Sequence, residues 1–329
     1  MQSLQDHPFS QLTPDIIMDA VESQGLLSDG RFIALNSYEN RVYQVGIDQE
    51  TPIIAKFYRP ERWSDAQILE DHEFSWQLSD KELPVVPPWR NSQGETLFEY
   101  NDFRFALYER KGGHAPELSN LDHLYVLGRL LGRIHSVGAI QAFQQRPTLD
   151  LESFGWASFK LVCEHIPASL HTAYSSLGRD ILDLMRYKLD SYGHVDLIRV
   201  HGDCHTGNIL WRDDHAHFVD LDDTLMAPAI QDLWMLLSGD QNEQKRQLQE
   251  LLEGYNEFYD FDLRQLQLIE IYRTLRIMQH VAWIAKRWSD PAFPIAFSWF
   301  NSERFWSEHI LTLREQFAAL HEPSLTIYP

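Results

Sequence analysis

The chain has 329 residues, of which 44% are hydrophobic, so it can bury a sizeable core and is not a wholly disordered protein. This length exceeds a typical domain of about 100–150 residues and favours two domains, or two lobes that share one cleft. With 28 basic and 48 acidic residues, the net charge is −20 at pH 7. A chain this acidic is not expected to bind bulk nucleic acid or an anionic membrane, although one nucleotide needs only a local pocket.

The sequence also predicts a soluble cytoplasmic protein. Its two cysteines, Cys163 and Cys204, are too few for a disulfide framework or a four-cysteine zinc site. Residues 1–7 lack the basic and apolar regions of a secretion signal. No apolar run approaches the roughly 20 residues that a membrane helix needs.

The first third of the chain predicts a small antiparallel sheet with two helices. Residues 12–26 have the pattern of a short amphipathic helix, with Thr13 as N-cap and Gly25 as its stop. A second helical pattern covers 64–79 and ends at the proline-rich segment 83–88. Runs of β-branched and aromatic residues predict five strands, near 31–36, 41–47, 52–58, 95–100 and 103–109.

Beyond the break at 111–113 the pattern is mainly helical. Helices are predicted near 120–137, 177–192, 241–259 and 263–288. The exception is 198–223, which alternates apolar and polar residues and is rich in His and Asp. We therefore predict an α+β protein with a β-rich lobe at 1–110 and a helical lobe at 111–329 that contains an embedded polar hairpin.

The segment 198–211 is the richest in chemistry. It places Asp203 and Asn208 in one short loop before an apolar strand, and 217–223 forms a second strand that ends in carboxylates. If these strands pair as a hairpin, their polar ends can face the same spot. Carboxylate and amide oxygens are the ligands that Mg²⁺ prefers, and a carboxylate kept off the metal can accept a hydroxyl proton. This pattern indicates phosphoryl transfer.

The arrangement resembles the protein-kinase-like superfamily and, within it, the aminoglycoside phosphotransferase and choline kinase branch. The H-G-D-x-H-x-x-N loop of that branch is matched by His201 to Asn208, and its D-x-D-like segment by Asp220 to Asp222. The resemblance implies a bilobal kinase-like fold with ATP as phosphoryl donor. It implies that Asp203 is the catalytic base, that Asn208 and Asp220 hold Mg²⁺, with Asp220 the principal ligand and also catalytic, and that His201 buttresses the loop.

Two other interpretations of this loop stay open. It could be an ordinary polar hairpin with surface His and Asp side chains. It could also bind zinc through His201, Cys204 and His205, with His215 and His217 nearby. Zinc sites usually draw on separated pairs of ligands, and the aspartates would then have no role, so magnesium is favoured.

A lysine that anchors phosphate is expected in the small lobe. The segment 53–56 loosely matches the kinase strand V-A-I-K and places Lys56 inside an apolar strand, where an unpaired ammonium is costly. Glu70, Asp71 and Glu73 of the next helix compete as its partner, and Glu70 is favoured. An edge-strand lysine that reaches water is the alternative.

Two further ATP contacts are expected. The turn at 35–43 lacks the kinase glycine pattern, but Ser37 could bind phosphate through its hydroxyl and nearby backbone N–H groups, unless this is an ordinary polar turn. The strand-to-hinge junction at 105–113 is expected to hold the adenine, with Glu109 and Arg110 as candidates.

Downstream features complete the resemblance. Asp232 lies in a segment that resembles the D-x-W helix start of kinases, which implies that it supports the catalytic-loop backbone, although an Asp near a helix start needs no function. The aromatic residues of 281–306 are expected in the core. The turn at 288–294 could border the acceptor cleft.

Within this branch, five segments resemble a group of bacterial Ser/Thr protein kinases of the stress response. They are 35–43, 56–63, 201–211, 218–223 and 288–294. The resemblance implies ATP-dependent phosphorylation of protein Ser/Thr, autophosphorylation, protection from stress-induced cell death, and a monomer.

Two other functions are weighed against this one. A small-molecule kinase for an amino alcohol, aminoglycoside or sugar would use the same loop, and an acidic protein attracts cationic acceptors. A non-catalytic ATP-binding scaffold would keep the fold, but the complete set of catalytic residue types argues against it.

Overall fold

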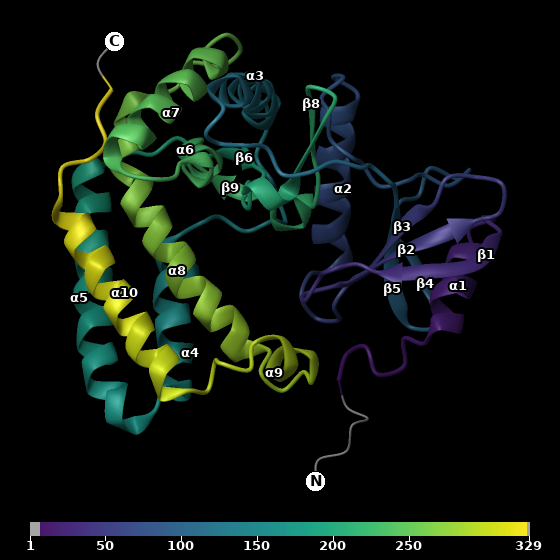
Figure 1. Ribbon diagram of the computed structural model, residues 1–329, viewed down its shortest axis with the longest axis horizontal. Coiled ribbons are helices and arrows are strands. Elements are labelled where there is room, and N and C mark those ends of the chain that lie inside the picture. Colours follow the sequence, from purple (N-terminus) through teal and green to yellow (C-terminus); the bar gives the residue numbers. More distant parts are fainter. Residues whose placement is uncertain (1–6, 328–329) are drawn as a thin grey trace.

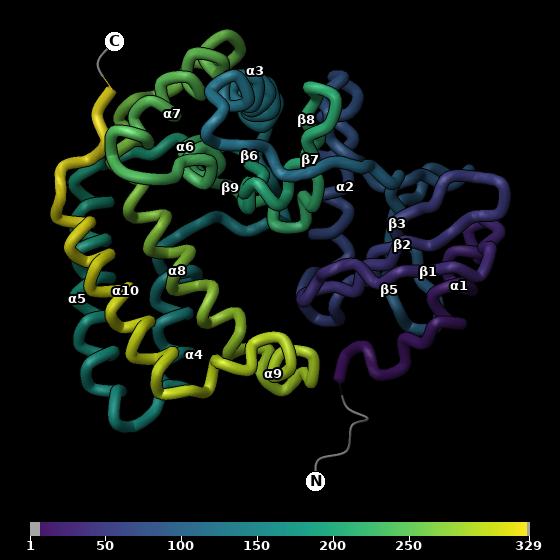
Figure 2. The backbone as a smooth tube through the Cα atoms, in the orientation of Figure 1, coloured from purple at the N-terminus to yellow at the C-terminus, as the bar shows by residue number. Residues whose placement is uncertain are grey.

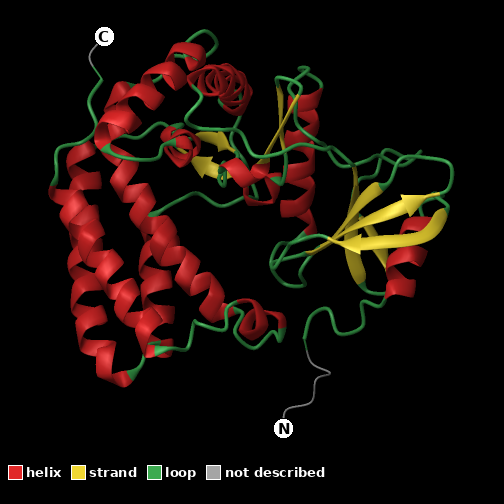
Figure 3. Cartoon of the chain, in the orientation of Figure 1, coloured by secondary structure: helices red, strands yellow, loops and turns green. Residues whose placement is uncertain are grey.

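The computed structural model describes residues 7–327, which form a five-stranded antiparallel sheet and a larger helical part (Figures 1 and 3). The strand order is β1-β2-β3-β5-β4. The strands are β1 (Ser28–Ala34), β2 (Arg41–Ile47), β3 (Ile53–Phe57), β4 (Phe98–Tyr100) and β5 (Phe103–Glu109). The predicted antiparallel sheet is therefore confirmed.

Two helices accompany the sheet, and each begins at a side-chain cap. α1 (Pro14–Glu22) contacts β1 and β4, and the Thr13 hydroxyl accepts a hydrogen bond from Ile16 N, as predicted for this N-cap. α2 (Asp65–Ser79) joins β3 to β4 and begins with a capping box between Ser64 and Gln67. The apolar faces of α1 and the sheet share one core.

The remaining helices form the larger part of the molecule. They are α3 (Leu121–Gly138), α4 (Ala157–His165), α5 (Ala168–Tyr192), α6 (Ile230–Leu233), α7 (Gln241–Tyr255), α8 (Ile269–Lys286), α9 (Ala292–Ala296) and α10 (Glu303–His321). Short π- or 3₁₀-helical turns occur at η1 (Leu151–Trp156), η2 (Thr206–Asn208), η3 (Leu221–Asp223), η4 (Trp234–Leu236) and η5 (Leu263–Leu268). Helices α4, α5, α8 and α10 pack together (Figure 2). None of the helices within residues 7–327 is both long and apolar enough to cross a bilayer.

The four predicted helices are confirmed, but the structure contains further helices that the sequence analysis does not predict. The four predicted helices correspond to α3, part of α5, α7, and η5 with α8. We did not predict α4 or α10. The signal for α10 was present, because Trp306, Ile310, Leu313 and Leu320 are buried at helical spacing.

Two small sheets hold the polar segment. β7 (Ile209–Arg212) pairs with β8 (His215–Phe218) as a hairpin, while β6 (Ile198–Val200) pairs with β9 (Leu225–Ala227). The Phe218 backbone also bonds with Pro84 and Val86, which follow α2, so the hairpin is fixed beside that helix (Figure 1). The boundary that we place between residues 110 and 111 falls in the segment from β5 to α3 and remains a proposal.

Candidate active site

The β7–β8 hairpin brings three of the predicted residues to one end. β7 begins directly after Asn208, and β8 ends two residues before Asp220. The Val219 amide donates to the Asn208 carbonyl at 3.0 Å. The Asn208 side-chain amide in turn donates to the Asp203 carbonyl at 3.0 Å. Asp203, Asn208 and Asp220 are therefore neighbours, as the sequence predicts for a hairpin.

Lys56 reaches the same place from the sheet. Its ammonium Nζ lies 2.5 Å from Asp220 Oδ1 and 3.9 Å from Asp222 Oδ1. Burial alone would lower the pKa of Lys56, but these two carboxylates raise it above its usual value. The lysine is therefore charged and paired, which is what a buried ammonium needs.

Asp220 has an unusual backbone and an accessible side chain. Its φ of 59° and ψ of 55° lie in the left-handed region, which Asp tolerates better than most residues. Its side chain is 52% exposed, although it contacts Lys56. The carboxylate can therefore meet a ligand that enters from solvent.

Asp222, in contrast, is buried and fastens the sheet to the helical part. Its carboxylate accepts hydrogen bonds from Arg62 Nη1 at 2.5 Å and Asn40 Nδ2 at 2.9 Å, and its carbonyl accepts from Arg146 Nη2 at 2.5 Å. Burial would raise the pKa of Asp222, but Lys56, Arg62 and Arg146 hold it well below its usual range. We did not predict Asn40, Arg62 or Arg146, and the only signal for Arg62 was its place in the 56–63 segment.

Asp232 lies beneath the catalytic loop. Its carboxylate accepts the backbone N–H groups of His201 at 2.8 Å and Gly202 at 2.9 Å, and it lies 3.0 Å from His135 Nε2. The His201 ring lies 3.0 Å from the Val219 carbonyl. These contacts fit the supporting roles proposed for Asp232 and His201.

Gly202 allows this support because of its conformation. Its φ is +84°, which L side chains rarely adopt, and an added Cβ would lie 2.2 Å from the Asp223 carbonyl oxygen. The loop therefore passes too close to the 221–223 turn for any other residue. This close approach places Asp203 beside the second acidic segment.

Asp203 itself is contacted by two basic side chains. Arg276 Nη1 of α8 donates to Asp203 Oδ1, and His205 Nε2 lies 3.5 Å from Oδ2. Burial would raise the pKa of this carboxyl, but His205 and Arg276 keep it well below its usual range. The proposed base is thus ionised. Sequence reasoning missed Arg276, because it lies within a helix that carries no motif.

The expected pair between Glu70 and Lys56 is not formed. The Glu70 carboxylate instead accepts the backbone N–H groups of residues 144–146 at 2.5, 2.8 and 2.8 Å. The next residue, Asp71, faces inward, is buried, and accepts from the Thr224 hydroxyl at 3.3 Å. Burial raises the pKa of Asp71 to about 7. Of the three candidates on α2, Asp71 therefore faces the site.

Of the other predicted ATP contacts, Glu109 and Arg110 are exposed and Ser37 is half-buried. The Ser37 hydroxyl donates to the Asn40 carbonyl at 3.3 Å. Glu109 pairs with Lys111 at 2.7 Å, and Arg110 Nε donates to Gln44 of β2 at 2.7 Å. The roles of Ser37, Glu109 and Arg110 toward ATP stay predictions.

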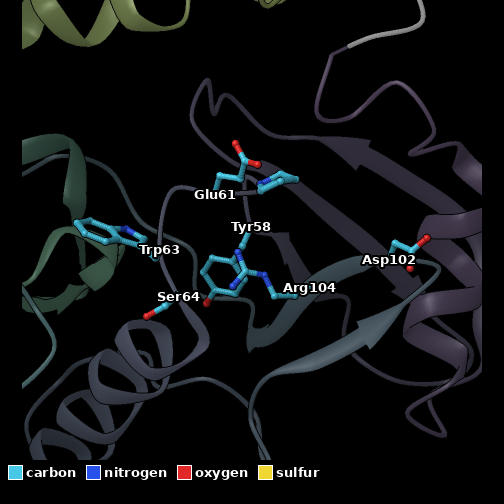
Figure 4. Close-up of a pocket in the computed structure, with 7 residues that line it drawn as sticks. Tyr58, Glu61, Trp63, Ser64, Asp102 and Arg104 are labelled. Carbon is cyan, nitrogen blue, oxygen red and sulfur yellow. The ribbon is translucent and has the colours of Figure 1, made fainter.

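A separate hollow lies where residues 58–64 join β3 to α2, beside the start of β5 (Figure 4). Its lining residues are Tyr58, Pro60, Glu61, Trp63, Ser64, Asp102 and Arg104. It shares no lining residue with the set gathered around Asp220. The candidate site is therefore the set of side chains gathered around Asp220 rather than this hollow.

The oxygen donors of the site fit Mg²⁺. The Asn208 amide nitrogen is used by the Asp203 carbonyl, which leaves its amide oxygen as the acceptor end, and the Asp220 carboxylate is accessible. Within residues 7–327, no three His, Cys, Asp or Glu side chains gather as a metal cluster. Mg²⁺ needs no such cluster, because it keeps waters and binds substrate phosphates.

Comparison with known proteins agrees with this geometry. A model of the phosphotransferase enzyme family matches residues 31–269. Stress response kinase A of Escherichia coli (strain K12) is 42% identical over 325 residues, which cover 98% of this chain and 97% of that protein. Serine/threonine protein kinase RdoA of Salmonella typhimurium is 40% identical over the same shares of the two chains.

Solved structures with lower identity establish the fold. An amicoumacin kinase in complex with AMP-PNP, Ca²⁺ and Ami has a TM-score of 0.73 at 19% identity and covers 94% of both chains. A microcompartment-associated aminopropanol kinase has a TM-score of 0.67 at 18% identity, covering 90% of this chain and 94% of its own. The predicted bilobal, protein-kinase-like α+β fold is therefore confirmed.

Proposed function

The chain belongs to the phosphotransferase enzyme family, as an ATP-dependent kinase that acts on an alcohol group, and we propose that this alcohol is a serine or threonine of a protein. The observation that carries the proposal is the convergence of Lys56, from the sheet, with Asp203, Asn208 and Asp220 of the helical part. The name of one relative, a serine/threonine protein kinase, supports the choice of acceptor.

Each residue of the site has a task in this proposal. Lys56 would hold phosphate oxygens by charge, and Asp203 would orient the acceptor hydroxyl and take its proton. The new bond joins the hydroxyl oxygen to the γ-phosphorus, and the bond to the β–γ bridging oxygen breaks, so that its electron pair leaves with ADP. Mg²⁺, held by Asn208 and Asp220, would neutralise charge on the phosphates. Position and electrostatics provide most of the acceleration.

The proposal also includes a cellular role. The name stress response kinase A, carried by relatives at 42% identity, supports a role in the bacterial stress response and in protection from stress-induced cell death. Autophosphorylation and a monomeric state are further parts of the proposal. A cytoplasmic location is supported by Cys163 and Cys204, which are both free thiols.

The test uses labelled ATP and two sets of acceptors. One set contains proteins with accessible Ser and Thr, including the enzyme itself, and the other contains amino alcohols, aminoglycosides and sugars. We expect Mg²⁺-dependent transfer to protein. Transfer to the small molecules alone would overturn the proposed acceptor but keep the kinase.

Asp203→Asn separates chemistry from binding. We expect turnover to fall at least about a hundredfold, since general-base groups contribute on this scale. Mg²⁺ and ATP should still raise the melting temperature of the variant, because Lys56 and Asp220 are unchanged. Asp213→Asn is the matched control, because Asp213 lies at the other end of the hairpin and is 88% exposed. Near-wild-type turnover of the Asp203 variant would contradict the role assigned to this carboxylate.

The small-molecule alternative rests on two observations. The net charge of −20 would attract a cationic acceptor. The solved structures with similar folds include kinases named for amicoumacin and aminopropanol. The positive charge of the Arg276 guanidinium, which contacts Asp203, argues against a cationic acceptor.

A further inference from the structure

The carboxylate of Asp203 has a partner on each oxygen, and one of them comes from outside the catalytic loop. Oδ2 lies 3.5 Å from both His205 Nε2 and Asn208 Nδ2, within the loop. Oδ1 accepts from Arg276 of α8. An acceptor hydroxyl that approaches Oδ1 therefore meets the guanidinium of Arg276.

Arg276 belongs to a basic face of α8 in an otherwise acidic chain. Three arginines lie on one side of α8 and its C-terminal end because of their spacing: Arg273, Arg276 and Arg287. Arg273 is paired with Glu270 at 2.5 Å, and Arg287 with Glu39 at 2.6 Å. Among the described residues, the carboxylate that pairs with Arg276 is Asp203 alone.

The pair between Arg276 and Asp203 is open enough to be exchanged. The Arg276 side chain is 40% exposed and that of Asp203 is 23% exposed. Ion pairs that water reaches contribute little to stability, so an incoming anion can replace one partner. The buried pairs of Asp222 lack this access.

We propose that Arg276 selects acceptors whose hydroxyl lies beside acidic groups, so that the substrate class is an acidic Ser/Thr segment of a protein. A carboxylate of the acceptor takes over the guanidinium, and Asp203 Oδ1 is freed to receive the hydroxyl proton. A cationic amino alcohol or aminoglycoside offers no such partner and meets a like charge, which is unfavourable. This inference rests on the proposed function and narrows it.

The test compares peptides that differ only in the residues flanking one serine, which are Glu, Gln or Lys. For the wild-type chain we expect kcat/KM to be about tenfold or more higher with Glu than with Lys flanks, because charge complementarity selects partners. In Arg276→Gln this ratio should fall below about threefold, mainly through KM. Arg276→Glu should favour the Lys-flanked peptide. Arg276→Lys keeps the charge and should keep the preference.

Arg273→Gln is the matched control, because it removes a guanidinium from the adjacent turn of α8 without touching Asp203. This variant should keep the wild-type ratio of kcat/KM between the Glu-flanked and Lys-flanked peptides. A substitution that acts only on the structure of α8 should keep this ratio as well. If Arg276→Gln does not fold, the same dependence is measured on the wild-type chain with added salt, which should reduce the preference.

Two results would overturn the inference, and they are distinguishable. If wild type phosphorylates the peptides but shows no preference for acidic flanks, or if folded Arg276→Gln keeps the full preference, the role of Arg276 is wrong while the proposed function stands. If wild type phosphorylates no peptide and no protein but does phosphorylate amino alcohols, the proposed function fails and this inference with it.

Discussion

The ammonium of Lys56 in β3 lies 2.5 Å from the carboxylate of Asp220, although 164 positions separate the two residues. Lys56 is buried, so its charge would be costly without this partner. The pair joins the five-stranded sheet to the loop that follows β8. When ATP and Mg²⁺ bind, Lys56 would contact phosphate and Asp220 would contact the metal. The first prediction tests the role of Lys56.

Lys56→Met should lower turnover by about two orders of magnitude, because a preorganised charge that faces the transferred phosphate is lost. Stability should change little, since the partner Asp220 is half exposed and can be hydrated. Lys81→Met, at an exposed position after α2, is the control and should keep full activity. The measurement is steady-state transfer from labelled ATP, together with thermal unfolding. Wild-type turnover in the Lys56 variant would remove this lysine from the site.

Glu70→Gln tests whether the Glu70 carboxylate of α2 holds the backbone of residues 144–146 rather than the nucleotide site. The Glu70 carboxylate receives three backbone N–H groups of residues 144–146, and the amide of Gln is a weaker acceptor. We expect a loss of about 1–3 kcal/mol in the free energy of unfolding, measured in urea, with an unchanged KM for ATP. Glu73→Gln, which affects only an exposed contact to Gln77, should change neither quantity. A KM for ATP that rises in the Glu70 variant would restore Glu70 as a partner of the nucleotide site.

Local sequence signals account for most of the elements. The strands of the sheet alternate as expected, and the caps at Thr13 and Asn120 use side-chain oxygens that bond within three residues. The gathering of Asn208 with Asp220 was also predictable, because a short hairpin determines which residues share an end. Such features depend on neighbours in the chain.

The remaining features depend on contacts between distant segments. Whether Glu70 or Asp71 faces the site is decided by how α2 packs against 144–146 and Thr224, and a change of one position rotates a helix by about 100°. Arg276 reaches Asp203 across 73 positions, with no motif to mark it. Spacing within one segment cannot predict such pairs.

The buried pair of Arg59 and Asp290 provides the third prediction. The two side chains are 2.6 Å apart, and only 9% and 3% of them are exposed. Arg59→Met leaves the buried Asp290 carboxylate with a longer ion pair to Arg41 at 3.6 Å and a hydrogen bond from the Ala292 backbone N–H at 3.0 Å, and should cost about 3 kcal/mol of unfolding free energy. Arg31→Gln is the control, since that pair is on the surface and its loss should not be measurable in the same urea titration. Equal stability of both variants would show that the 59–290 contact contributes nothing.

The fourth prediction follows from the buried carboxyl of Asp71. Burial raises its pKa from 3.8 to about 7, so the folded state keeps a proton that the unfolded state has already released. The stability that this proton provides is complete below the unfolded pKa and is lost as the pH rises through about 7. Between pH 6 and pH 8 the wild-type chain should therefore lose about 1 kcal/mol of unfolding free energy relative to Asp71→Asn, which has no proton to release.

Urea unfolding of both chains at pH 6, 7 and 8 measures this difference directly. Asp183→Asn, at an exposed position of α5, should follow the wild-type curve and serves as the control. The sign is decisive, because Asp71 also lies near Arg146 and Lys56, whose charges favour the ionised form. If wild type gained stability over Asp71→Asn as the pH rose, these cations would outweigh burial, and Asp71 would be an ionised partner of Lys56 rather than a neutral carboxyl beside it.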